Sequence, residues 1–132
     1  IGGEGNGGVI LPELHYGRDA LVGIAIFLTQ LAKSGKKISA LRDSYPKYTI
    51  SKNKIALTPE INVDNVLSKM AANYAKLEVD STDGVKIYFE KEWVHLRKSN
   101  TEPIIRIYSE SENESKANEL AERIIGEIKE VL

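Results

Sequence analysis

The segment Gly2–Gly8 combines glycines with one carboxylate and one carboxamide. Residues 1–8 hold five of the ten glycines of the chain, with Glu4 and Asn6 between them. Glycine lets the backbone approach a ligand closely, and Glu accepts hydrogen bonds from two hydroxyls while Asn both donates and accepts. This combination suits the neighbouring hydroxyls of a sugar ring. Two alternatives stay open: a turn that binds nothing, and a dinucleotide loop, although that fingerprint places the strand before the glycines and not after them.

A second candidate is the segment Arg97–Pro103, which lies between two predicted strands and reads Arg-Lys-Ser-Asn-Thr-Glu-Pro. The planar fork of arginine matches two phosphate oxygens at once, and the segment adds further donors next to free backbone N–H groups. These donors are Ser99, Asn100 and Thr101. The pattern predicts a phosphate-binding loop, and the alternative is an ordinary hairpin loop, in which Ser, Asn and Thr are common.

Arg106 follows in the strand after this loop. The preferred interpretation is a sheet residue that pairs with Glu102. The alternative is a second phosphate-binding arginine.

Other residues with reactive or aromatic side chains favour structural roles. His15 and Asp19 stand before a helical segment, where a packing histidine and a helix-starting aspartate are the preferred interpretation. His95 alternates with apolar residues on a strand and is interpreted as a surface histidine. The rings of Trp93, Tyr88 and Tyr108 resemble a platform for nucleic-acid bases, but no basic surface accompanies them, so packing on a sheet is favoured.

Composition excludes several classes of function. The 132 residues are 42% hydrophobic and 28% charged, which is typical of a globular chain with room for one domain or two small ones. The net charge of -1 gives no field that would hold a nucleic acid or a membrane, so an anion must be held by a local site. Without cysteine, thiolate metal sites and cysteine catalysis are excluded, and two histidines make a histidine metal cage unfavourable.

The first 45 residues predict part of an α/β domain. A short strand at residues 9–11 precedes a helix from about Tyr16 to Ser34 that is apolar on almost every side, with Gly35 as its C-terminal cap. Such a helix needs cover on several faces, so we expect it to pack against a sheet that this sequence largely lacks. The chain starts at Ile1 without an initiator Met or a leader-like stretch, so we expect it to be cut from a longer protein.

Residues 46–132 predict an α+β domain, separated from residues 1–45 at Pro46. A second short helix at residues 38–43 precedes this boundary. After it, strand-like segments lie near residues 48–57, 77–80, 85–89, 93–97 and 104–110, and helical stripes cover residues 63–74 and 117–131. The order β-α-β-β-β-α that we derive from them counts four of the five segments as strands. We summarise this order as a four-stranded antiparallel sheet with two helices on one face. Asn62 or Asp64 is the expected cap of the first helix, and Ser111 with Glu114 a capping box for the last.

The two loops together resemble those of the α-D-phosphohexomutase family. Gly2-Gly3-Glu4-Gly5-Asn6-Gly7 is similar to the sugar-binding loop usually written GGExSGH, and Arg97–Pro103 is similar to the phosphate-binding loop R-x-S-[GN]-T-E-P. Their order, their separation and the Asp83-Gly84-Val85 turn and strand agree with the family's C-terminal part. The resemblance covers essentially all of the chain. Two positions depart from the pattern: Asn6 stands where Ser is more frequent, and Gly8 where many relatives have His.

The resemblance implies a phosphoryl transfer between the C1 and C6 oxygens of hexose or hexosamine phosphates, such as those of glucose, mannose or glucosamine. It implies a phosphoserine, a bisphosphate intermediate and Mg²⁺ in the intact cytoplasmic enzyme, with the serine and the metal ligands in domains absent from this sequence. The sequence would then be the tail of domain 3 (1–45) and the TBP-like domain 4 (46–132), inactive alone. Glu4 and Asn6 would contact sugar hydroxyls. The implied phosphate contacts are Arg97, Ser99, Asn100, Thr101 and Arg106.

The alternative is a protein of another functional class, namely a stand-alone sugar-phosphate or anion-binding module without catalysis.

Overall fold

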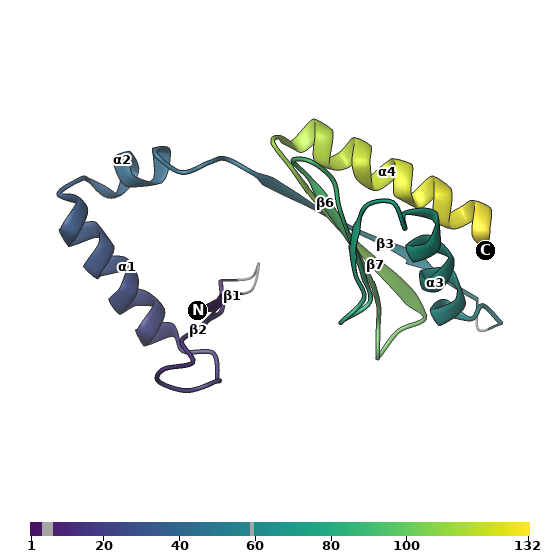
Figure 1. Ribbon diagram of the computed structural model, residues 1–132, viewed down its shortest axis with the longest axis horizontal. Coiled ribbons are helices and arrows are strands. Elements are labelled where there is room, and N and C mark those ends of the chain that lie inside the picture. The colour runs from purple at the N-terminus through teal and green to yellow at the C-terminus, as the bar shows by residue number, and fades with distance from the viewer. Residues whose placement is uncertain (4–6, 59) are drawn as a thin grey trace. The chain divides into compact units, whose positions relative to one another are not determined.

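A break in packing after Pro46 divides the chain into two units, Ile1–Pro46 and Lys47–Leu132. The computed structural model describes residues 1–3, 7–58 and 60–132 (Figure 1). Glu4 and Asn6, the predicted sugar contacts, lie outside the described residues. None of the helices formed by the described residues is both long and apolar enough to cross a membrane.

The first unit holds a small hairpin and two helices. Strand β1 (Gly2–Gly3) pairs antiparallel with β2 (Val9–Ile10), so the first two glycines of the glycine-rich segment are themselves part of a strand. Helix α1 spans Ala20–Ser34 and α2 spans Ile38–Asp43. The predicted start of α1 at Tyr16 was wrong, because the Asp19 side chain accepts from the Val22 amide and caps the helix there. The predicted cap at Gly35 is confirmed, with φ 62°.

Helix α1 is apolar on most sides, and none of its residues is buried. Leu21 is 77% exposed, Ile24 54% and Leu28 53%. A helix that is hydrophobic all round is typical of the interior of a larger domain. The expectation that a further sheet covers α1 stays a prediction.

The second unit is built on one antiparallel sheet in the order β3-β7-β6-β5-β4. Its strands are β3 (Thr49–Ala56), β4 (Glu78–Asp80), β5 (Val85–Tyr88), β6 (Trp93–Lys98) and β7 (Ile104–Ser111). The α+β class is confirmed, but the sheet has five strands and not the predicted four. The fifth is the three-residue β4, which pairs only with β5 at the edge of the sheet.

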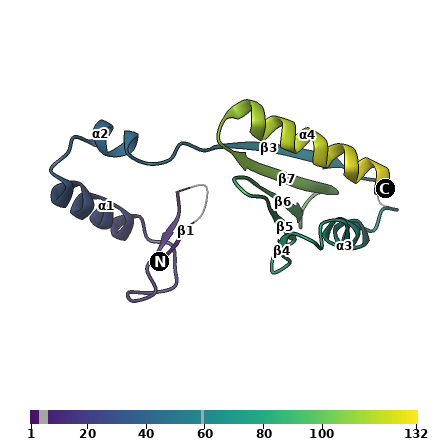
Figure 2. The ribbon, with the colours of Figure 1, turned by 45° about the horizontal axis from the view of Figure 1, so that its top comes forward.

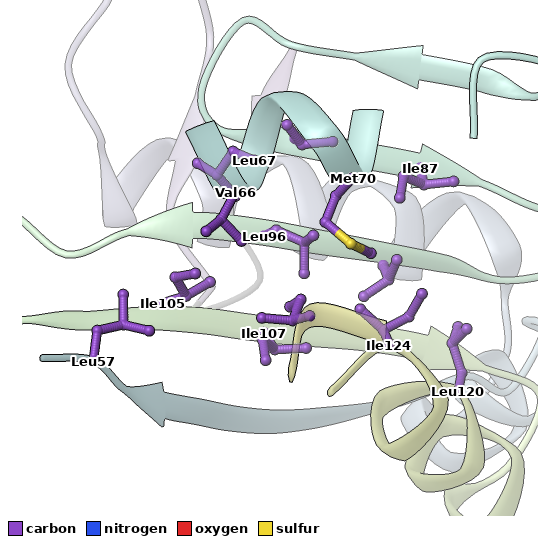
Figure 3. Packing of buried hydrophobic residues seen from close by; sticks show 13 residues of the cluster. Leu57, Val66, Leu67, Met70, Ile87, Leu96, Ile105, Ile107, Leu120 and Ile124 are labelled. Atoms are coloured by element: carbon purple, nitrogen blue, oxygen red, sulfur yellow. The ribbon is translucent and has the colours of Figure 1, made fainter. Parts of the chain in front are cut away.

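Helices α3 (Val63–Asn73) and α4 (Glu114–Val131) cover one face of this sheet (Figure 2). Alternate residues of each strand point toward them, and Figure 3 shows Met70 of α3 above Ile87 and Leu96 of the sheet. The stripe that predicted α4 is confirmed, because Ala117, Leu120, Ala121, Ile124 and Ile128 are buried. The opposite face carries no helix of the second unit, and its side chains include most of the charged residues discussed below.

The caps of these two helices differ in how well the sequence predicted them. Asn62 accepts from the Asn65 amide and caps α3, as expected. For α4 the predicted capping box at Ser111 was wrong, because Asn113 accepts from the Lys116 amide. Ser111 instead ends β7, where its hydroxyl donates to Glu92 at 3.0 Å.

One hydrogen-bonded pair joins the end of α3 to α4. The hydroxyl of Tyr74 lies 2.8 Å from each carboxylate oxygen of Glu127. Burial of the ring, followed by this hydrogen bond and the charge of Glu127, raises the pKa of Tyr74 to about 12. The contribution to stability is therefore complete below pH 10, the ordinary tyrosine pKa, and is lost as the pH rises toward 12.

We expect Tyr74→Phe to lower the free energy of unfolding by about 1 kcal/mol at neutral pH, because the partly buried Glu127 loses its donor. Urea unfolding followed by tryptophan fluorescence measures this value. The difference between wild type and variant should shrink between pH 10 and 12. Tyr48→Phe is the control, since Tyr48 is 51% exposed; a difference that stays constant up to pH 12 would contradict the assignment.

Candidate functional site

The predicted phosphate-binding loop is a tight connection between β6 and β7. The amide of Ser99 donates to the Ile104 carbonyl at 3.1 Å, and the amide of Ile104 donates to the Glu102 carbonyl at 2.8 Å. The Pro103 carbonyl accepts from the Leu57 amide at 2.8 Å, which ties the loop to the chain after β3. The loop is therefore fixed at both ends, and only its tip projects from the sheet.

Ser99 organises the tip from a buried position, with 8% exposure. Its Oγ accepts from the Thr101 amide at 3.4 Å and lies 3.5 Å from the Thr101 hydroxyl. Asn100 and Thr101 are exposed. In the part of the chain that the structure describes, no hydrogen bond occupies the backbone N–H of Asn100 or Glu102. Unoccupied amides beside two hydroxyls and a carboxamide are suitable donors for an anion.

Two arginines face each other beside this loop. Arg97 of β6 and Arg106 of β7 are direct cross-strand partners on the helix-free face. Lys54 of β3 is the partner of Arg106 on its other side. Side chains directly opposite in an antiparallel pair lie about 5 Å apart at Cβ, and like charges there are destabilising. We call Lys54, Arg106 and Arg97 the cation row; it crosses three strands at the loop end of the sheet.

The cation row is only partly neutralised. Arg97 Nε lies 3.2 Å from Asp83 Oδ2. The preferred interpretation of Arg106 as the partner of Glu102 was wrong, because within residues 1–3, 7–58 and 60–132 no ion pair joins them. Both border an open hollow of about 300 Å³. Its lining residues are Lys52, Asn53, Lys54, Glu102, Ile104, Arg106 and Tyr108.

The turn between β4 and β5 places Asp83 next to Arg97. At its start, Asp80 accepts from the Thr82 amide at 2.8 Å, and hydrogen bonds from Thr82 hold the pKa of Asp80 below its usual range. At its end, Gly84 has φ +78°, and a Cβ there would lie 2.2 Å from the Leu96 carbonyl oxygen. The turn backbone therefore rests directly on β6.

The aromatic residues of the helix-free face pack on the sheet, as preferred from the sequence. Lys86 Nζ lies 4.2 Å from the centre of the Trp93 ring and 4.8 Å from that of Tyr88. Trp93 Nε1 donates to Glu110 at 2.8 Å. Lys52 lies over the Tyr108 ring at 5.5 Å. The three aromatic side chains are therefore explained by cation–π contacts with lysines and by cross-strand pairs on the sheet.

In the first unit, His15 serves the start of α1. His15 Nδ1 accepts from the Gly17 amide at 3.0 Å, so the neutral ring carries its proton on Nε2, which lies 3.1 Å from Asp19 Oδ2. The Val22 amide and then His15 hold the pKa of Asp19 below its ordinary value. The predicted helix-starting role of Asp19 is confirmed, but His15 is exposed and not packed.

The structure thus brings together Arg97, Ser99, Asn100, Thr101 and Arg106 at one end of the sheet. Sequence reasoning missed Lys54 and Asp83 as neighbours of this site, because only the strand register places them there. An Asp-Gly pair directly before a strand was the available signal for the turn. Among the described residues, no group of three His, Asp or Glu side chains is arranged to hold a metal ion.

Two family profiles match this chain: "Phosphoglucomutase/phosphomannomutase, alpha/beta/alpha domain III" over residues 1–48, and "Phosphoglucomutase/phosphomannomutase, C-terminal domain" over residues 55–127. A phosphoglucomutase/phosphomannomutase of Thermococcus kodakarensis is 44% identical in a match that covers 100% of this chain and 29% of the relative. A phosphoglucosamine/phosphogalactosamine mutase of Sulfurisphaera tokodaii is 37% identical, with 99% and 28% covered. The chain therefore spans less than a third of the length of these relatives.

Among solved structures, a phosphoglucomutase/phosphomannomutase family protein from Burkholderia thailandensis is similar in fold. The TM-score is 0.65 at 23% identity, and the match covers 96% of this chain and 28% of that chain. At this identity the likeness supports the fold alone.

We expect Gly84→Ala to lower the free energy of unfolding by about 2 kcal/mol or more, because the new Cβ meets the Leu96 carbonyl and a positive φ is unfavourable for alanine. Gly126→Ala is the matched control. Gly126 lies on the exposed side of α4 with nothing within 4 Å of its Cβ position, so alanine there should stabilise by about 0.5–1 kcal/mol. Urea unfolding measures both, and equal effects at the two positions would contradict the close approach.

Proposed function

Because the chain belongs to the phosphoglucomutase/phosphomannomutase family, as its two loops predicted, we propose that it is the substrate-binding C-terminal part of a phosphohexomutase. The intact enzyme interconverts the 1-phosphate and 6-phosphate of a hexose, with glucose, mannose and glucosamine as the candidate sugars. The reaction runs through a phosphoserine enzyme and a bisphosphate intermediate. The names of the two relatives described above, a phosphoglucomutase/phosphomannomutase and a phosphoglucosamine/phosphogalactosamine mutase, support this range of sugars.

The observation that carries the proposal is the cross-strand pair of Arg97 and Arg106 beside the loop Ser99–Pro103. Two guanidinium groups held opposite each other repel unless an anion lies between or above them. A phosphate monoester is a dianion, and its oxygens match the arginine fork. The hydroxyls and unoccupied amides of the loop supply the remaining donors. This arrangement favours the role of Arg106 as a second phosphate contact.

In this proposal the loop holds the phosphate that is not being transferred. A bisphosphate intermediate must react at either end, so the site has to accept both orientations of the sugar against one phosphate anchor. A few exposed donors on a rigid loop allow this, whereas a close-fitting pocket would select one orientation. Since phosphoryl transfer depends on positioning and charge stabilisation, the contribution of these residues is to bind and orient the substrate.

The relatives are more than three times as long as this chain, and we assign the remaining catalytic groups to the part of the enzyme that lies outside the matched segment. That part would supply the phosphoserine and the ligands of Mg²⁺, which neutralises phosphate charge when bound. The described residues of this chain do not fit a magnesium site, because no acidic cluster is present among them. The same part would cover the exposed faces of α1. We place the intact enzyme in the cytoplasm, as expected for metabolism of sugar phosphates.

We expect Arg97→Ala in the intact enzyme to lower kcat/KM by at least tenfold and to raise KM, because one charge-assisted hydrogen bond to phosphate contributes about 1.5–3 kcal/mol. Steady-state assays with the phosphates of glucose, mannose and glucosamine measure this loss and rank the sugars.

Lys91→Ala is the matched control for Arg97→Ala. Lys91 is an exposed cation in the turn between β5 and β6, at the other end of β6 from the loop, and pairs with Glu112. It should keep kcat/KM within about twofold. An unchanged kcat/KM in Arg97→Ala would refute the phosphate role, and phosphate binding without turnover in the intact protein would favour a binding module.

We further expect Glu4→Gln to reduce kcat more than it reduces phosphate affinity, because the sugar and not the phosphate loses an acceptor. Parallel measurement of kcat and of the dissociation constant for inorganic phosphate separates the two. Equal losses of both would argue that the glycine-rich segment is structural.

A further inference from the structure

The turn that carries Asp83 is fixed to β6 by contacts that do not involve the Asp83 side chain. Gly84 lies so close to the Leu96 carbonyl that no Cβ fits between them. His95 Nε2 lies 2.6 Å from the Asp83 carbonyl oxygen, which can only accept, so this nitrogen carries the proton. With its backbone held at two points, Asp83 presents its carboxylate at a set position beside Arg97.

The carboxylate of Asp83 contacts one particular edge of the Arg97 guanidinium. Its Oδ2 lies 3.2 Å from Nε. The guanidinium is planar, with one N–H on Nε and two on each terminal nitrogen. A bond at Nε therefore fixes the plane of the group and leaves the four terminal N–H donors available to a second anion.

Stability does not explain this ion pair. Both side chains are exposed, 50% for Arg97 and 62% for Asp83, and exposed ion pairs contribute little to the free energy of folding. Arg97 also stands opposite Arg106, so without a fixed partner its long side chain would turn away from the neighbouring cation. The pair therefore matters for where the guanidinium points.

We propose that Asp83 is a positioning residue, which holds Arg97 through Nε so that the terminal nitrogens face the phosphate bound at the loop Ser99–Pro103. This proposal rests on the proposed phosphate-binding function. An arginine ordered before binding loses less conformational freedom when the phosphate arrives. A carboxylate next to an anion site also opposes the anion by its charge, so orientation must outweigh repulsion for Asp83 to assist binding.

Substitutions at Asp83 separate these two effects. Asp83→Asn keeps an oxygen acceptor for Nε and removes the charge, whereas Asp83→Ala removes both. The probe is inorganic phosphate, titrated into the 132-residue chain at constant ionic strength and followed by NMR of backbone amides and of the arginine Nε–H groups. We expect Asp83→Ala to weaken phosphate binding about three- to tenfold and Asp83→Asn to stay within twofold of wild type or to bind more tightly.

The Arg97 Nε–H signal gives a readout that does not depend on phosphate. Without phosphate, it should shift in Asp83→Ala and stay near its wild-type position in Asp83→Asn. The amide signals of Gly84 and His95 report whether the turn is intact. If Asp83→Ala disturbs the turn, Asp83→Ser is the deciding variant. Serine is common in turns, and its side chain is shorter than that of aspartate, so it lacks the carboxylate that contacts Arg97. We expect weakened phosphate binding in this variant too.

The positioning role would be overturned if Asp83→Ala binds phosphate as tightly as wild type or more tightly. If Asp83→Ala disturbs the turn, the same criterion applies to Asp83→Ser. Arg97→Ala in the same titration distinguishes this failure from a failure of the proposed function. If Arg97→Ala binds phosphate as well as wild type does, the loop is not a phosphate site. If Arg97→Ala loses binding while the Asp83 variants do not, the phosphate site stands and only the positioning role falls.

Discussion

The register between β6 and β7 is the constraint on which the rest of the site depends. It sets Arg97 opposite Arg106 on one face and Leu96 opposite Ile107 on the other. A slip of one residue would turn the buried pair to solvent and separate the arginines onto different faces. Because Leu96 and Ile107 are fully buried under the helices, the hydrophobic core itself fixes the position of the charges.

The two faces of the sheet therefore have different tasks that are physically linked. Helices α3 and α4 close one face, and they and the strands together bury the apolar side chains of the core, which is the main stabilising contribution. The other face keeps its cations exposed, which costs stability unless an anion binds. Lys98 shows the link at the loop itself: it follows Arg97 in the chain and reaches Asp64 at the start of α3, 3.0 Å away.

The sequence allowed the helices and most strands to be predicted because their signals are periodic and local. The stripe of α4 and the Asn62 cap of α3 are such signals, and both are present in the structure. The short strand predicted at residues 77–80 is confirmed as Glu78–Asp80, and the four-stranded summary was wrong because it counted one strand too few; pairing with β5 makes this segment the fifth strand. Ser111 was misread as a cap because its pattern fits one, while cross-strand pairing with Thr49 kept it in β7.

The site was likewise predictable only where its signal is local. Its loop is contiguous in the sequence, whereas the charged residues around the loop come from separate strands. A net charge of -1 already indicated that an anion must be held locally and not by a general field. In the structure, the register places Lys54, Arg106 and Arg97 from three strands at one end of the sheet, beside the proposed phosphate loop. Glu110 lies on the same face at the other end of β7, bonded to Trp93. The strand register, and not the composition, therefore gathers these three cations at the end of the sheet where we propose that phosphate binds.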